Sequence, residues 1–106
     1  MINFDDFAKL DLRIGKVLEV SSHPDAEKLY LLKVDIGEKT IQIVAGVKAF
    51  YSQSELEGRL VAVVVNLEPK SIRGFVSEGM LLAGQSAENV SLLIADKAIA
   101  VGSKIR

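Results

Sequence analysis

The chain has 106 residues, of which 49% are hydrophobic and 25% charged, a composition that indicates one globular domain and excludes a disordered, collagen-like or long coiled-coil chain. It contains no cysteine and one histidine, which excludes disulfides, thiolate catalysis and a zinc site built from several cysteines or histidines. Lys and Arg number 13 and Asp and Glu 14, for a formal net charge of -1, so any nucleic-acid site has to be local.

The chain shows no pattern of a membrane protein. Its longest apolar run, Leu60 to Val65, is far shorter than the roughly 20 residues of a membrane-spanning helix. The polar start of the chain also lacks the layout of a signal peptide. We therefore expect a single cytoplasmic domain over residues 1–106, with no membrane partner.

The first half of the chain predicts a short helix and three strands. Asn3, with Asp6 three residues later, predicts the start of a helical turn. Apolar residues alternate from Leu12 to Val20, which predicts a strand, and Gly15 within it suggests a bend or bulge. Between residues 32 and 45, two further alternating segments flank a glycine turn and predict a hairpin.

The second half predicts one more helix and two strands before the C-terminal region. Ser52, with Glu55 three residues later, predicts a capping box and a short helix. The apolar run that begins at Leu60 predicts a strand buried on both faces. The segment from Leu67 to Gly79 is expected to be a loop, and Met80 to Ala83 is expected to be the next strand.

Five short strands with a helix between the third and the fourth favour a Greek-key barrel of the OB type. Two further β-like segments, Val90 to Ala95 and Ile99 to Ile105, are not needed to close such a barrel, so they should pair with it or with another subunit. As an apolar, unpaired strand edge they would be unfavourable on a monomer. We therefore expect an all-β fold: a five-stranded barrel with a short helix and a C-terminal β extension used for dimerisation.

In the OB fold, ligands lie across strands two and three, between the loop joining strands one and two and the loop joining strands four and five. In this chain those loops are Ser21 to Lys28 and Leu67 to Gly79, and their polar and basic side chains suit phosphate and ribose oxygens. A merely solvated loop is the alternative. His23 and Asp25 lack a nucleophile to complete a catalytic set, and few aromatic residues are present to stack on single-stranded bases. The pattern favours recognition of the backbone and shape of a folded RNA.

Several motifs in the same order resemble the tRNA-binding domain, which occurs in methionyl-tRNA synthetases as a C-terminal part or a separate β-subunit, in free tRNA-binding proteins and in synthetase-associated cofactors. The motifs are Asp11-Leu12-Arg13-Ile14-Gly15-Lys16-Val17, His23-Pro24-Asp25-Ala26-Glu27-Lys28-Leu29-Tyr30, Ile43-Val44-Ala45-Gly46, and Asn66-Leu67-Glu68-Pro69-Lys70 through Arg73-Gly74 to Ser77-Glu78-Gly79-Met80.

The resemblance implies an OB fold, structure-dependent tRNA binding without catalysis, no cofactor and no metal, and a homodimer built by segments outside the barrel. It also implies a methionyl-tRNA synthetase catalytic chain as a partner if the protein is a subunit. Two departures from the family pattern, Ala45 and Glu68, predict weak binding. The tRNA contacts that the resemblance implies are His23, Lys28, Lys33, Asn66, Lys70, Arg73, Ser77 and Met80.

Two alternatives stay open. A small dimeric chaperone linked to protein export shares this fold and a similar opening at Asp5-Asp6-Phe7, and it would expose an apolar groove for unfolded peptide. A subunit that mainly tethers a synthetase dimer would instead co-purify with a catalytic chain. The His23 to Tyr30 motif favours tRNA binding over the chaperone.

Overall fold

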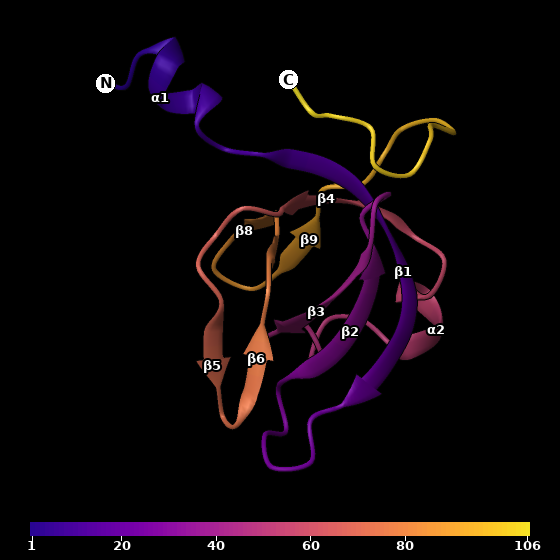
Figure 1. The fold of residues 1–106 in the computed structure, drawn as a ribbon. Coiled ribbons are helices and arrows are strands. Elements are labelled where there is room, and N and C mark those ends of the chain that lie inside the picture. Colours follow the sequence, from indigo (N-terminus) through magenta and orange to yellow (C-terminus); the bar gives the residue numbers. More distant parts are fainter.

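The computed structural model describes all residues from 1 to 106 and shows an all-β fold around a nearly closed five-stranded barrel, with two short helices (Figure 1). No helix is long and apolar enough to cross a membrane. In chain order the elements are α1 (Phe4–Ala8), β1 (Leu12–Ser22), β2 (Tyr30–Asp35), β3 (Thr40–Ala45), α2 (Gln53–Leu56), β4 (Leu60–Val64), β5 (Lys70–Ile72), β6 (Phe75–Ser77), β7 (Met80–Leu81), β8 (Ala83–Gln85) and β9 (Val90–Leu92).

The long strand β1 organises the main sheet, whose order is β3-β2-β1-β4-β7. Its second half pairs with β2 and its first half with β4, both antiparallel. A bulge between Val17 and Glu19 bends the strand. The predicted bulge at Gly15 is therefore misplaced. A Cβ at Gly15 would lie 2.7 Å from Val34 and 2.9 Å from Val63, so glycine is required there for close packing across the barrel.

Side chains close the barrel where regular backbone pairing ends, between β3 and the chain joining β6 to β7. The Val44 N–H donates to Ser77 Oγ (3.0 Å). The Gln42 N–H donates to the Glu78 carboxylate (2.8 Å), and the Glu78 N–H donates to the Gln42 carbonyl (2.8 Å). We call these contacts the barrel seam. They satisfy the donors of β3 that an adjacent strand would otherwise bond.

The barrel interior is filled by branched aliphatic side chains from β1 to β4, including the fully buried Leu32, Val34 and Val61. A tyrosine relay attaches the C-terminal hairpin to this core. The Tyr30 hydroxyl donates to the Tyr51 carbonyl (2.8 Å), and the Leu92 N–H donates to the Tyr51 hydroxyl (3.0 Å). The relay satisfies the polar atoms of both rings.

Most predicted elements are confirmed. The Asn3 side chain caps α1 by accepting from the Asp6 N–H, and Ser52 and Glu55 form the predicted capping box of α2. The hydrogen bonds from Ser52 to the Glu55 carboxylate lower the pKa of that group below its ordinary value. The hairpin of β2 and β3 and the strand that begins at Leu60 also form as predicted.

The predicted loop from residue 67 to 79 is wrong, because it contains the hairpin of β5 and β6. Its two turn residues, Arg73 and Gly74, both have positive φ, 52° and 90°. Such a two-residue turn matches the twist of the strands it joins, but Asn or Gly usually occupies the position that Arg73 holds. The sequence pattern therefore carried no hairpin signal at this point.

The C-terminal region pairs with the barrel of its own chain, which is one of the two arrangements expected for it. β8 and β9 form a hairpin of their own, and the residues after it bond to barrel strands of the same chain. The Ala95 N–H donates to the Leu60 carbonyl (3.0 Å), and the Ile105 N–H donates to the Leu12 carbonyl (2.9 Å). The backbone of this extension is thus largely paired within the chain, whereas Leu93 and Ile94 remain 50% exposed.

The extension also packs closely against the turn between β2 and β3. A methyl group added at this contact should therefore destabilise the fold. A Cβ at Gly102 would lie 2.9 Å from the Gly37 Cα and 3.0 Å from the Ile36 carbonyl oxygen. Gly58 has a similar positive φ, 83° against 88°, but open space around it. We expect Gly58→Ala to lower the free energy of unfolding by about 1 kcal/mol, the cost of the backbone conformation alone. We expect Gly102→Ala to lower it by about 2–4 kcal/mol because the backbones must also separate. Equal losses in denaturant titrations of the two variants would contradict this close contact.

Candidate nucleic-acid interface

The loop between β1 and β2 and the tip of the β5–β6 hairpin lie together at one end of the barrel (Figure 1), and His23 connects them. Its side chain is 3% exposed. Its Nδ1 accepts from the Asp25 N–H (3.0 Å), so the ring proton is on Nε2, which donates to the Arg73 carbonyl (2.9 Å). Both ring nitrogens are therefore occupied.

The Arg73 side chain in turn hydrogen-bonds the loop that carries His23. Its Nη2 donates to the Asp25 carbonyl (2.9 Å). Phe75 packs against the His23 ring edge to face, with ring centroids 4.8 Å apart at 73°. We call His23, Asp25, Arg73 and Phe75 the inter-loop clasp. The clasp fixes the two loops as one unit and leaves the exposed Arg73 guanidinium at the surface.

This geometry changes the role predicted for His23. Its imidazole is buried and fully hydrogen-bonded, so the structure gives it no direct access to tRNA. Its ring instead joins the backbones of the two loops at Asp25 and Arg73. The contributions of Phe75 and the Asp25 backbone were not predicted, because their partners lie on the other loop.

Two other residues predicted to contact tRNA, Ser77 and Asn66, form hydrogen bonds within the fold. Ser77 is buried in the barrel seam, where its hydroxyl also donates to the Gly79 carbonyl (3.0 Å). The Asn66 side chain accepts from the Asp11 N–H and donates to the Lys9 carbonyl, both at 2.8 Å. It thereby joins the start of β1 to the end of β4. The adjacent Asp11 carboxylate is hydrogen-bonded by Arg13, which lowers the pKa of Asp11.

Lys70 and Met80 do share a surface feature. They line a groove of about 610 Å³ between the base of the β5–β6 hairpin and the barrel. The Met80 side chain is 47% exposed. The other groove residues are Val44, Leu67, Glu68, Ile72, Ser77 and Gly79. We call this feature the hairpin groove; its walls are mainly apolar and two charged side chains line it.

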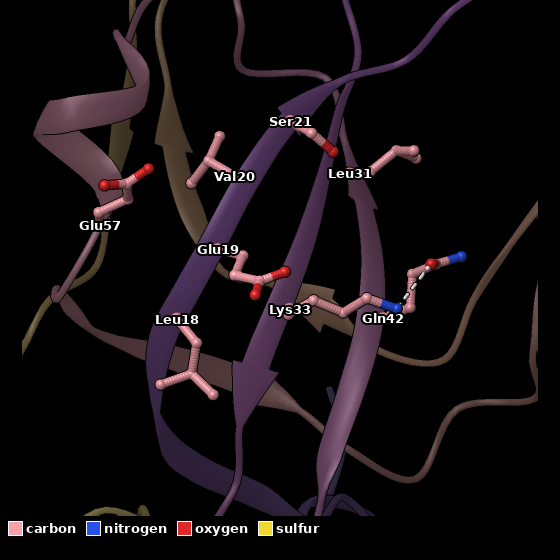
Figure 2. A pocket seen from close by; sticks show the side chains of 8 residues that line it. All are labelled: Leu18, Glu19, Val20, Ser21, Leu31, Lys33, Gln42 and Glu57. Carbon is pink, nitrogen blue, oxygen red and sulfur yellow. Dashed lines mark hydrogen bonds between the residues drawn. The ribbon is translucent and has the colours of Figure 1, made fainter.

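Lys33 lies on the outer face of β2, in a shallow groove of about 380 Å³ that Figure 2 shows. Its Nζ donates to the Gln42 amide oxygen (3.1 Å), and the carboxylates of Glu19 and Glu57 line the same groove. Gln42 in turn donates to the Val76 carbonyl on β6 (2.9 Å). Lys33 therefore lies on a face that continues towards the hairpin, but it is not clustered with Lys70.

Lys28 lines a third hollow on the surface, together with Arg73, Asp25 and Glu27. Each predicted cation thus has carboxylates among its neighbours. Acidic and basic groups alternate across this face, so positive charge does not dominate it. Binding of an anion must then depend on individual, well-placed cations, because such a face has no strong attractive field. No group of His, Asp and Glu side chains is arranged to hold a metal ion.

Comparisons with known proteins agree with the fold. The family model described as "Putative tRNA binding domain" matches residues 12–104. The chain is 54% identical over 105 residues to a methionine–tRNA ligase of Pyrococcus abyssi, covering 99% of this chain and 14% of the relative. The chain therefore spans about one seventh of the length of such curated relatives.

Two solved structures are similar over the whole chain. A methionyl-tRNA-synthetase-related protein from Pyrococcus horikoshii superimposes with a TM-score of 0.94 at 31% identity, with 100% of this chain and 98% of the other covered. The chaperone CsaA from Bacillus anthracis superimposes with a TM-score of 0.90 at 37% identity, with 100% and 99% covered.

The inter-loop clasp can be tested without any ligand. His23→Ala removes both hydrogen bonds and the contact with Phe75, so we expect the free energy of unfolding to fall by about 1–3 kcal/mol. Amide hydrogen exchange at Asp25 and in the β5–β6 hairpin should also become faster. His23→Gln keeps a donor for the Arg73 carbonyl and should lose less. Unchanged exchange at Asp25 in His23→Ala would show that the clasp does not hold the loops.

Proposed function

The chain belongs to the tRNA-binding domain family, whose model covers residues 12–104, and from this we propose that it binds tRNA in a structure-dependent, non-catalytic manner. The observation that carries the proposal is the inter-loop clasp, which presents Arg73 beside Lys28 at the end of the face where barrels of this fold bind nucleic acid. Lys70 lies at the base of the same hairpin.

The similarity to a segment of methionine–tRNA ligases suggests the larger enzyme in which the domain works. We propose that the domain contributes tRNA affinity to a methionyl-tRNA synthetase catalytic chain, either as an appended domain or as a separate subunit. A free tRNA-binding protein is the second form of this role. A cytoplasmic location, where tRNA is aminoacylated, follows from either form.

The proposed mode is contact with the backbone and shape of a folded tRNA. The face offers separated cations and polar side chains, without aromatic platforms for several stacked bases. Catalysis is disfavoured because both nitrogens of the only histidine are bonded within the clasp, so it has no free nitrogen for proton transfer.

Peptide binding is the second candidate function, and the hairpin groove favours it. Leu67, Ile72 and Met80 give this groove apolar walls, as a chaperone for unfolded segments requires. The similar chaperone structure supports the same candidate. We place tRNA first because the matching family model describes a tRNA-binding domain, and because Lys28, Lys70 and Arg73 lie on the two loops of the candidate interface.

We also propose a homodimer. Leu93, Ile94 and Ile99 are about half exposed on the C-terminal extension. A second apolar groove lies between α1 and residues 104–106, with Phe4, Phe7 and Leu10 beside Lys104 and Arg106. The acidic first turn of α1 could pair with these cations in a second copy, since a two-fold contact uses the same surface twice.

Replacement of Lys70 and Arg73 by alanine tests the tRNA site. We expect the double variant to lose most binding to total tRNA and the salt dependence of log K to flatten, because each lost phosphate contact lowers the slope by about one unit. If the protein contacts on the order of three phosphates, wild-type affinity should fall at least about tenfold between 50 and 200 mM salt.

Two controls accompany this measurement. Lys39→Ala, in the turn at the far end of the β2–β3 hairpin, should bind like wild type. His23→Ala should bind more weakly with an unchanged slope, because it removes no cation but leaves the two loops to be ordered on binding. Wild-type binding by the Lys70 and Arg73 double variant would place the site elsewhere and favour peptide binding or tethering.

The dimer can be tested by sedimentation at micromolar concentration. We expect wild type to sediment as a dimer, and the double variant Ile94→Glu with Ile99→Glu as a folded monomer, because it buries carboxylates in the interface. Leu18→Glu, at a similarly exposed apolar position on β1, should remain dimeric. A monomeric wild-type protein would refute the proposal.

A further inference from the structure

The hairpin groove contains two opposite charges that do not pair. Glu68 and Lys70 both line it and are two residues apart. The ion pairs in the structure are instead Lys9 with Asp6 and Arg13 with Asp11. Neither Glu68 nor Lys70 takes part in a side-chain hydrogen bond, and both residues are exposed. The groove therefore offers one free carboxylate and one free ammonium group to a ligand.

A carboxylate on an RNA-binding face is unfavourable beside phosphates unless it meets a donor. In RNA, the N–H groups on the edges of unstacked bases are such donors. Guanine presents two adjacent donors, N1–H and the N2 amino group, which match the two oxygens of one carboxylate. Adenine and cytosine each present a single amino group beside an acceptor nitrogen, and uracil presents one N–H between two carbonyls. Glu68 is therefore best matched by guanine.

The remaining walls suit the flat faces of a base. Leu67, Ile72 and the exposed thioether of Met80 are apolar, and methionine sulfur makes favourable contacts with aromatic rings. The groove volume of about 610 Å³ lies within the range of sites for small ligands. Lys70 supplies the positive charge that a neighbouring phosphate requires.

We infer that the hairpin groove is a subsite for one unstacked guanine nucleotide, in which Glu68 accepts from N1–H and the N2 amino group and Lys70 contacts the adjacent phosphate. The inference rests on the proposed tRNA binding and adds a base preference to it. An apolar peptide side chain would fill the walls but would leave both charges unused. The pair of free charges therefore favours a ligand that carries both donors and an anion.

Glu68→Gln should change the affinity for tRNA in opposite directions, depending on whether Glu68 bonds guanine or only lies near the RNA. If Glu68 only lies near the RNA, Glu68→Gln removes repulsion and should strengthen tRNA binding. If it bonds guanine, the variant should weaken binding about five- to tenfold, within the range of one bidentate base contact, because the new amide donor faces a guanine donor. Glu27→Gln, on the facing loop, is the matched control and should bind as well as wild type or slightly better. An affinity of Glu68→Gln equal to or above that of wild type would overturn the inference while leaving the proposed function intact.

Direct binding of short RNAs makes the test independent of tRNA. We expect the pentanucleotide UUGUU to shift the amide signals of Glu68, Lys70 and Met80 at lower concentration than UUAUU or UUCUU. UUIUU, whose inosine lacks only the N2 amino group, should be intermediate. Glu68→Gln should remove the preference for UUGUU. Equal titration curves for the four RNAs, or shifts of these signals by an unfolded model peptide but not by UUGUU, would refute the guanine subsite. If UUGUU is preferred but tRNA does not bind, the proposed function fails and the subsite stands.

Discussion

The candidate interface depends on the barrel seam. Backbone pairing between β3 and the chain after β6 consists of one hydrogen bond, from the Glu78 N–H to the Gln42 carbonyl. The Gln42 N–H donates to the Glu78 carboxylate, and the Val44 N–H donates to Ser77 Oγ. Side-chain acceptors take the place of a strand here. Since β6 leads directly into this seam, the seam holds the base of the β5–β6 hairpin on the barrel. Both the hairpin groove and the surface position of Arg73 follow from it.

The clasp then holds the other end of the hairpin. His23 and Arg73 exchange hydrogen bonds with backbone groups of each other's loop, so the hairpin is fixed at its base and at its tip. A surface that is ordered before binding loses less conformational entropy when a ligand arrives. This matters for a face on which cations and carboxylates alternate, because the long-range attraction that could compensate for a flexible site is weak.

The near balance of cations and carboxylates on this face is also relevant to the similarity of the chain to both a synthetase-related protein and a chaperone. The same barrel can serve different ligands, and the fold alone does not choose between them. The choice depends on the polar groups around the groove. In this chain these groups include the unpaired carboxylate of Glu68 and the unpaired ammonium group of Lys70.

Local patterns in the sequence were sufficient for much of the fold. Alternation predicted β1 to β3, a continuous apolar run predicted β4, and short-range capping signals predicted both helices, because these features depend on residues a few positions apart. The hairpin of β5 and β6 was missed because Arg73 replaces the usual turn residue. The exposed cations Lys28 and Lys70 could be placed on the two candidate loops from the order of strands alone.

Tertiary structure decided the roles of the other site residues. His23 bonds a carbonyl 50 residues away, Ser77 an amide 33 residues away and Asn66 an amide 55 residues away. In the sequence these three are polar loop residues that resemble ligand contacts. Only the folded chain shows that each of these side chains bonds a distant backbone group and thereby stabilises the fold, because such partners cannot be identified from neighbouring positions in the sequence.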